Sequence, residues 1–262
     1  MIGNALISTA VAPIHRKSNF TSEMVTQGLM FESLSIRQKK DNWYNVMMDD
    51  GYEGWINTFY LSDSKIHSTN NLILYNRYTP IRSKCSRDSN VLALLSFGTL
   101  VPLLEKTSKY YRIQIINGDE GFIPPQSKIV TCSRDFIIHL AHSQIGTPYL
   151  WGGKSSFGYD CSGFIQMVLK AAGISVNRDA SQQAETEQLE KISMEEAEPG
   201  DLIFFSESNL IKHVAFIAGD GKIIHCEGQV KLESIIEGEV GFNSSLGKMY
   251  HQVTSIAKLI YS

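Results

Sequence analysis

Short alternating runs of apolar and polar residues fill the first half of the chain and predict β-strands rather than helices. One pattern occurs twice, 67 positions apart, as WYNV at 43–46 with GYEGWI at 51–56 and again as YYRI at 110–113 with GDEGFI at 118–123. Gly, Asn, Asp and Lys separate the runs in each copy. Such an internal repeat of short strands indicates two small all-β barrels.

From about residue 130 the apolar residues follow a helical period instead. Residues 135–145 predict one helix, which Gly146 and Pro148 end, and residues 161–172 predict a second. A series of strands begins near 199 and includes a hairpin around GDG at 219–221. Helices followed by strands indicate an α+β domain.

These patterns divide the 262 residues into three domains, a number that the length allows. We expect the two all-β barrels at residues 7–63 and 70–129 and the α+β domain at 130–262.

Cys161 stands where a glycine-rich, aromatic stretch at 149–160 meets the second predicted helix. A cysteine in the first turn of a helix faces the positive end of the helix dipole, which favours the thiolate over the thiol. The thiolate is the reactive nucleophile. Because most cysteines are inert core residues, Cys161 is a candidate only together with a base.

His213 and His225 fall on the two strands of the predicted hairpin, equally far from Gly219. This parity predicts that both side chains lie on one face, roughly opposite each other, while Cys226 points into the core. If the helix that starts at Cys161 packs on this face, His213 can accept the thiol proton and His225 can orient the His213 ring. The backbone N–H of Cys161 would stabilise an oxyanion. The pattern therefore predicts acyl transfer through a thioester.

Charge and hydropathy exclude several classes of partner. The net charge of −3 comes without a basic block or stripe, so we expect neither nucleic acid nor an anionic membrane surface as a partner. No run approaches the ~18 apolar residues of a membrane span. The first 13 residues lack a basic segment followed by an apolar one, which predicts a cytoplasmic protein. Export is the alternative if a leader has been removed.

Metal and cofactor sites are not expected. The four cysteines contain no C-x-x-C pair, and their wide spacing favours free thiols over disulfides; they are Cys85, Cys132, Cys161 and Cys226. His139 and His142 lie three residues apart on a predicted helix, but no further ligand stands at a matching spacing.

Five motifs of the second half resemble, in order and spacing, the NlpC-type cysteine peptidases of bacterial cell-wall metabolism. They are YLWGG at 149–153, DCSG at 160–163, RDASQQ at 178–183, PGDLIFF at 199–205 and HVAFIAGDGKIIH at 213–225. The two preceding copies resemble bacterial SH3-like domains, a combination similar to the γ-D-glutamyl-L-diamino acid endopeptidase subgroup. The resemblance implies a papain-like α+β fold. It also implies cleavage of the bond after D-Glu in peptidoglycan stem peptides that begin with free L-Ala.

The same resemblance assigns roles to residues at matching positions. It makes Cys161 the nucleophile, His213 the general base and His225 the orienting third member. It also implies a set of substrate-binding residues, in which Trp151 lines the L-Ala subsite, Ser162 binds the peptide, and Asp160 and Tyr52 hold the free amine. In the second barrel Asp119 occupies the position of Tyr52, which indicates different roles for the two copies. Asp160 is also a candidate helix cap.

Two further positions are weaker candidates for substrate binding. Related proteins often carry a hydroxyl directly after the Arg-Asp pair, where this chain has Ala180 followed by Ser181. Arg178 is a candidate either for the α-carboxylate of D-Glu or for a structural ion pair.

Two other functions compete with the endopeptidase. The first keeps the fold but acts as an amidase or acyltransferase on cell-wall or lipid substrates, and a closed pocket of Tyr52, Trp151 and Asp160 argues against a long acyl chain. The second is a non-catalytic cell-wall binding protein, against which the intact Cys/His/His set argues. The choice between diaminopimelate and lysine, and the oligomeric state, stay open.

Overall fold

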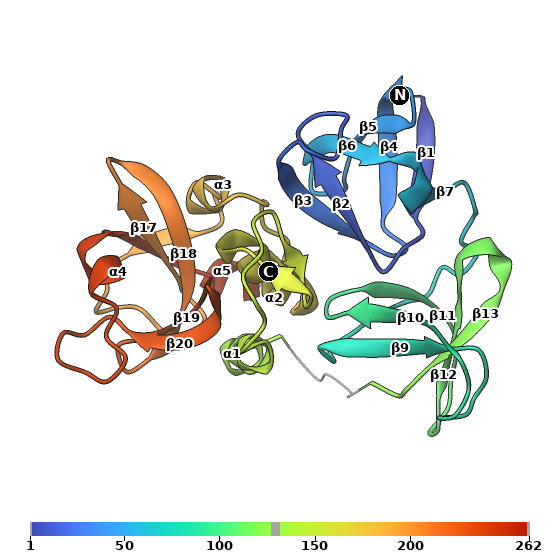
Figure 1. Cartoon of the computed structure of the whole chain (residues 1–262). Helices are drawn as coiled ribbons and strands as arrows, with labels where there is room; N and C mark the ends of the chain where they lie inside the picture. The colour runs from blue at the N-terminus through green and yellow to red at the C-terminus, as the bar shows by residue number, and fades with distance from the viewer. Residues whose placement is uncertain (1, 127–131, 261–262) are drawn as a thin grey trace. The chain divides into compact units, whose positions relative to one another are not determined.

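The computed structural model describes residues 2–126 and 132–260 (Figure 1). The described residues before 127 form one compact unit, and those after 131 form another. The predicted domain boundary at 129/130 and the predicted end at 262 lie outside the described residues. Within the described ranges no helix is long and apolar enough to cross a membrane.

Seven short strands form the first sheet, in the order β3-β2-β6-β5-β4-β1-β7, and all the pairs are antiparallel. Alternate apolar residues of these strands meet in one cluster, which accounts for the alternation in the sequence. The first strand starts at Gly3, before the predicted start of the barrel at 7. The strands are β1 (Gly3–Ile7), β2 (Val11–His15), β3 (Met24–Leu29), β4 (Ser33–Lys40), β5 (Trp43–Met47), β6 (Glu53–Asn57) and β7 (Leu61–Ser62), with the 3-10 turn η1 (Thr58–Tyr60).

The second sheet repeats this architecture in the order β10-β9-β13-β12-β11-β8. The repeated glycine has the same function in both copies, because a Cβ on Gly54 would lie 2.5 Å from Ile14 and one on Gly121 would lie 2.5 Å from Ile81. A close approach of two strands therefore underlies the repeat. The strands are β8 (Asn71–Ile73), β9 (Tyr78–Arg82), β10 (Val91–Ser96), β11 (Leu100–Lys106), β12 (Tyr111–Gln114) and β13 (Glu120–Ile123), with η2 (Ile116–Gly118).

The two sheets share a hydrophobic contact within the first unit. Buried Met30 belongs to the core cluster of the second sheet, and Ala10 and Phe31 pack against the same cluster. Each barrel therefore covers an apolar edge of the other.

The second unit has two helices, a six-stranded antiparallel sheet and three short helices. Its sheet order is β16-β21-β17-β18-β19-β20, beside a two-stranded ribbon β14-β15. Both predicted helices are present with ends within two residues, and the α+β arrangement is confirmed. The elements are α1 (Arg134–Ser143), β14 (Lys154–Ser155), β15 (Gly158–Tyr159), α2 (Cys161–Ala171), α3 (Ala180–Ala184), β16 (Glu190–Ile192), β17 (Leu202–Glu207), β18 (Leu210–Gly219), β19 (Lys222–Glu227), β20 (Gln229–Ser234), α4 (Ser244–Lys248), β21 (Tyr250–Ser255) and α5 (Ala257–Ile260).

The central helix α2 is almost entirely buried and packs against β18 and β19. Fully buried Asp201 ties the ends of other elements together. Its Oδ1 accepts hydrogen bonds from Arg134 of α1 at 2.7 Å and from the backbone N–H of Ile256 at 3.0 Å. Such a fully paired carboxylate fixes the scaffold on which the site is built.

Candidate active site

Cys161 is the first residue of α2 and directly follows the N-cap residue Asp160. Oδ1 of Asp160 accepts a hydrogen bond of 2.7 Å from the backbone N–H of Gly163, which satisfies one of the donors left unpaired in a first helical turn. A Cβ on Gly163 would lie 2.1 Å from the carbonyl oxygen of Gly153, so only glycine lets the preceding loop approach this closely. The local sequence therefore holds the sulfur at the helix start.

The sulfur of Cys161 lies against strand β18. It accepts hydrogen bonds from the backbone N–H groups of Val214 and Ser162, and the first of these belongs to the peptide group that joins His213 to Val214. Burial, followed by the negative charge of Asp160, raises the pKa of the Cys161 thiol to about 11, although the two hydrogen bonds lower it. The backbone N–H group at the helix start does lower the pKa of Cys161, as the sequence predicts, but desolvation of the charged sulfur outweighs it.

His213 lies on β18 and His225 on β19. The register pairs Phe216 with Ile224, which puts Ala215 opposite His225 and His213 one diagonal step further along β18. The two histidines therefore lie roughly opposite each other, as expected, with an offset that arises because residues 220–221 form the turn and move its centre past 219. The displacement is an even number of residues, so both side chains keep a common face.

The two imidazole rings are in contact. Nε2 of His213 and Nδ1 of His225 lie 2.8 Å apart, and the ring planes are nearly perpendicular, at 88°. Burial, followed by the charge of His225, lowers the pKa of His213 to about 3, and burial also lowers the pKa of His225. Both rings are therefore neutral at pH 7. The nitrogen of His213 outside this contact, Nδ1, is the one that can act as a base.

Helix α2 packs on the sheet face opposite to the one that carries the histidines. Phe164 of α2 meets Phe216 edge-on, with ring centroids 5.7 Å apart, and Phe216 points away from the His213 face because an odd number of residues separates them. The condition that α2 packs on the histidine face is therefore not met. The end of the helix, rather than its apolar side, brings Cys161 to the peptide that follows His213.

Two residues at the site, Glu233 and Tyr149, were not predicted from the sequence. Glu233 on β20 accepts a hydrogen bond of 2.9 Å from Nε2 of His225. Tyr149 is the second residue, and its phenol lies near Cys161. Burial, followed by the charge that Cys161 carries as a thiolate, raises the pKa of this phenol to about 12. Tyr149 therefore remains a neutral O–H donor. Strand alternation could have pointed to Glu233. β19 and β20 pair across the turn at Gly228 so that His225 lies opposite Lys231, and Glu233, two residues further, lies on the same face of the sheet. Nothing local distinguishes Tyr149 from the other aromatic residues of its motif.

A buried ion pair lies beside the first turn of α2. Arg178, with a side chain 1% exposed, donates to Oδ1 of Asp160 at 3.0 Å and to Oδ2 at 2.5 Å. It also donates to the hydroxyl of Ser162 at 3.0 Å. Of the two candidate roles of Arg178, the structure places it in the ion pair, where its guanidinium has almost no surface for a substrate carboxylate. The carboxylate of Asp160, by contrast, keeps 12% of its surface exposed.

The remaining predicted binding residues occupy separate places. Trp151 is 61% exposed in the loop before β14, and Ser181 is exposed on α3. Tyr52 belongs to the first unit, in the turn between β5 and β6, where its backbone N–H donates to Oδ1 of Asp50 at 3.0 Å. The structure brings Asp160, Ser162 and Arg178 together in one network.

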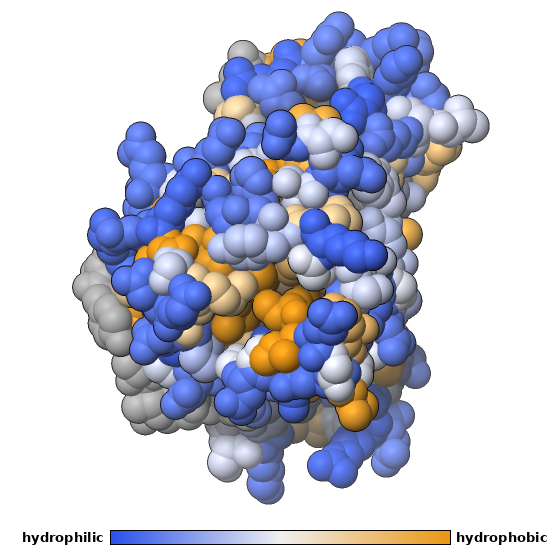
Figure 2. Space-filling model, turned by 90° about the vertical axis from the view of Figure 1, so that its left-hand side faces the viewer, coloured by the Kyte–Doolittle hydropathy of each residue, from blue (hydrophilic) through white to orange (hydrophobic). Residues whose placement is uncertain are grey.

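Apolar side chains are exposed along one stretch of the second unit. They surround the loop that precedes Cys161 and are Ile145, Tyr149, Leu150, Trp151 and Phe157. On the face drawn in Figure 2, apolar residues likewise gather in patches within a mostly hydrophilic surface.

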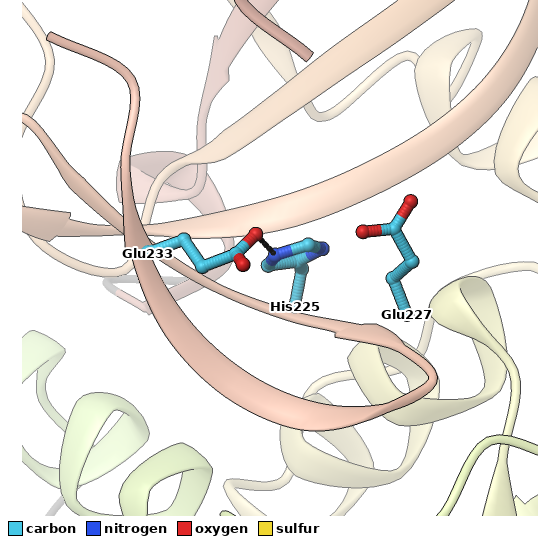
Figure 3. A group of neighbouring side chains, drawn as sticks. All are labelled: His225, Glu227 and Glu233. Atoms are coloured by element: carbon cyan, nitrogen blue, oxygen red, sulfur yellow. Dashed lines mark hydrogen bonds and ion pairs between the residues drawn. The ribbon is translucent and has the colours of Figure 1, made fainter. Parts of the chain in front are cut away.

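Among the described residues, one group of side chains has the spacing of metal ligands. Ligand atoms of His225, Glu227 and Glu233 all lie within 4.8 Å of one another (Figure 3). The ammonium group of Lys231 already lies 3.0 Å from Glu227 and 2.9 Å from Glu233, and Nε2 of His225 is bonded to Glu233. The group therefore fits a cluster of ion pairs and hydrogen bonds better than a metal site.

Two family models match the chain. Residues 146–250 match the NlpC/P60 family, and residues 14–59 match the bacterial dipeptidyl-peptidase Sh3 domain. The first match contains Cys161, His213 and His225, and the second lies within the first sheet.

Similar proteins extend the likeness over most of the chain. A γ-D-glutamyl-L-lysine dipeptidyl-peptidase of Bacillus cereus is 30% identical over 226 residues, which cover 78% of this chain and 67% of that protein. A protein of the same name from Bacillus subtilis is 31% identical over 216 residues, covering 76% of this chain and 71% of the relative.

Solved structures agree on the fold. The crystal structure of an NlpC/P60 family protein from Bacillus cereus has a TM-score of 0.83 and 22% identity, and the match covers 97% of this chain and 99% of that one. The chain belongs to the NlpC/P60 family of cysteine peptidases.

Proposed function

We propose that the protein hydrolyses the bond between γ-D-Glu and the diamino acid in peptidoglycan stem peptides with a free N-terminal L-Ala. The observation that carries this proposal is the arrangement of Cys161, His213 and His225. The chain also matches a γ-D-glutamyl-L-lysine dipeptidyl-peptidase over 226 residues, which is more residues than either unit contains. A likeness of that length involves the SH3-like part as well as the catalytic unit.

The mechanism follows from the states of the three side chains. Both the thiol and the imidazoles are neutral in the free protein, because burial raises the pKa of Cys161 and lowers that of His213. The proton passes from the sulfur to Nδ1 of His213 as the sulfur attacks the γ-carbonyl of D-Glu. His213 then returns the proton to the leaving amine, and water hydrolyses the thioester. Backbone N–H groups at the start of α2 stabilise the oxyanion.

Recognition of the free amine involves Asp160, Tyr52 and Trp151 in this proposal. Arg178 already balances the charge of Asp160. The substrate's ammonium group would therefore gain a hydrogen bond to the exposed part of the Asp160 carboxylate, but little further attraction from its charge. One hydrogen bond to a charged group contributes about 1.5–3 kcal/mol. Selectivity for the free amine then also depends on the space that Trp151 leaves for L-Ala.

A requirement for a free amine would favour released peptides over intact wall, where the amine is linked to the glycan. We therefore propose that the protein is cytoplasmic and recycles wall fragments. Fractionation of cells that carry a tagged full-length protein tests the location, and recovery in the medium or wall would contradict it.

Mass spectrometry of peptide cleavage tests the function. The substrates are L-Ala-γ-D-Glu-L-Lys, its diaminopimelate counterpart and the N-acetylated form of each. We expect release of L-Ala-D-Glu from the free-amine peptides, loss of activity in Cys161→Ala, and full activity in the matched control Cys85→Ala, because Cys85 is exposed outside the site. Equal cleavage of the acetylated peptides would discard the amine pocket, and no cleavage of any peptide would discard the substrate.

A further inference from the structure

A carboxylate continues the row of catalytic side chains beyond His225. Nε2 of His213 lies 2.8 Å from Nδ1 of His225, and Nε2 of His225 lies 2.9 Å from Oε2 of Glu233. The three groups come from the adjacent strands β18, β19 and β20. Figure 3 shows the Glu233 carboxylate directed at the ring of His225, while Glu227 lies on the other side of the ring.

Elementary hydrogen-bond chemistry fixes the protons along this row. An ionised carboxylate can only accept, so Nε2 of His225 carries a hydrogen and donates it. A neutral imidazole has one N–H, so Nδ1 of His225 is an acceptor, and Nε2 of His213 must donate to it. The remaining nitrogen of His213, Nδ1, then has a free lone pair. We propose that Glu233 is a positioning residue that holds the two histidines in the tautomers in which Nδ1 of His213 can take the proton of the Cys161 thiol.

The surroundings keep Glu233 ionised and oriented. Lys231 lies 2.9 Å from Oε1, and the side-chain amide of Asn243 donates to Oε2 at 2.7 Å. Burial raises the pKa of Glu233, but hydrogen bonds from Asn243, Lys231 and His225 outweigh it and hold the pKa below its usual value. Two independent contacts thus fix the plane of the carboxylate toward His225.

The same carboxylate stabilises the charge that develops during the reaction. When the thiol proton moves to Nδ1 of His213, the ring becomes an imidazolium that still donates through Nε2 to His225. The negative charge of Glu233 raises the pKa of His213, and the positive charge of Lys231 lowers it. The proton stays on His213, and Glu233 itself does not take it up. The charged groups that act on the row are therefore Glu233, Lys231 and, near His225, Glu227.

The inference rests on the proposed function only for its activity assay, because the tautomers can be read without substrate. Long-range proton–nitrogen NMR of protein labelled with 15N-histidine reports which ring nitrogen of His213 and His225 carries the hydrogen. We expect the Nε2–H tautomer at both rings in the wild type. A proton on Nδ1 of His225 in the wild type would overturn the proposal.

Two variants and one control complete the test. Glu233→Met removes the acceptor, and we expect mixed tautomers and a fall in kcat of about 10- to 100-fold with KM unchanged. Glu233→Gln keeps an acceptor oxygen without the charge, so we expect retained tautomers and a smaller fall in kcat. Glu190→Gln is the matched control, because Glu190 is an exposed carboxylate on β16, at the other edge of the sheet from β20, and pairs with Lys258; we expect wild-type tautomers and activity.

The readouts separate the possible failures. Unchanged tautomers and kcat in Glu233→Met would overturn the positioning role. Failure of the wild type to cleave any stem peptide would remove the proposed substrate, whereas the NMR of the wild type would still decide the tautomers. If Glu233→Met does not fold, the wild-type spectrum and Glu233→Gln decide the outcome, and loss of the Nε2–H signals in Glu233→Gln would count against the proposal.

Discussion

The buried ion pair of Arg178 and Asp160 allows a quantitative prediction. In Arg178→Met the carboxylate of Asp160 loses both guanidinium hydrogen bonds, at 3.0 and 2.5 Å, and keeps only those from Gly163 and Ser162. Removing one partner of a buried pair leaves an uncompensated charge and costs about 3–5 kcal/mol. With a side chain 1% exposed, Arg178 belongs to that class rather than to the surface pairs. We therefore expect the second unit to lose about 3–5 kcal/mol of unfolding free energy.

The compensating variant separates charge from packing. Asp160→Asn keeps a good helix cap but leaves the guanidinium unpaired, so it should destabilise the unit by a similar amount. The double variant Arg178→Met/Asp160→Asn carries no buried charge, and we expect it to be more stable than the sum of the single changes by about 1–3 kcal/mol. Lys258→Met is the matched control, because its pair with Glu190 is more than half exposed on both sides; we expect less than about 1 kcal/mol.

Hydrogen exchange of the α2 amides under increasing denaturant is the appropriate assay, since it reports on the second unit alone. Peptide cleavage is measured in parallel on the folded fraction. If Arg178→Met costs less than about 1 kcal/mol and instead raises KM tenfold or more, the ion pair is not structural and Arg178 contacts the substrate. That result would refute the reasoning from burial.

Three further predictions follow from charge and exposure. Because burial raises the pKa of Cys161 to about 11, iodoacetamide at pH 7.5 should modify exposed Cys85 faster than Cys161 in peptide-level mass spectrometry, and the reverse order would contradict a resting thiol. The pKa of His213 is lowered to about 3, while an unfolded histidine titrates near 6.5, so the unfolded chain binds more protons between these values. His213 by itself should therefore contribute a loss of about 1.4 kcal/mol of unfolding free energy per pH unit as pH falls below 6.5, so hydrogen exchange in β18 and β19 should show a shallower slope in His213→Asn; equal slopes would contradict this. Finally, Tyr52→Phe should raise KM for the free-amine peptide about tenfold at unchanged kcat. Asp119→Ala, at the matching position of the second barrel, should change neither KM nor kcat. Equal effects of the two variants in steady-state kinetics would contradict an amine contact by Tyr52.

Local chemistry made a large part of this protein readable from its sequence. The helix start at Cys161 depends on its neighbours, because Asp160 caps the turn and Gly163 permits the close approach of the loop. The common face of His213 and His225 depends only on strand alternation across a short turn. The internal repeat likewise predicted two all-β barrels, since each copy contains the same turns and the same close-packed glycine.

What the sequence left undecided depends on groups distant along the chain and on burial. Arg178 had two candidate roles, and only the packing that buries its guanidinium against Asp160 places it in the ion pair. The sequence predicted that the helix start favours the thiolate of Cys161, but the net pKa depends on desolvation, which many distant residues cause together. Glu233 joins His225 only because three strands lie side by side and Asn243 orients its carboxylate. Sequence alone therefore determined which elements form and which residues are candidates for the reaction. The tertiary structure decided their protonation and their partners, because both depend on how much water and charge the surrounding chain leaves at each atom.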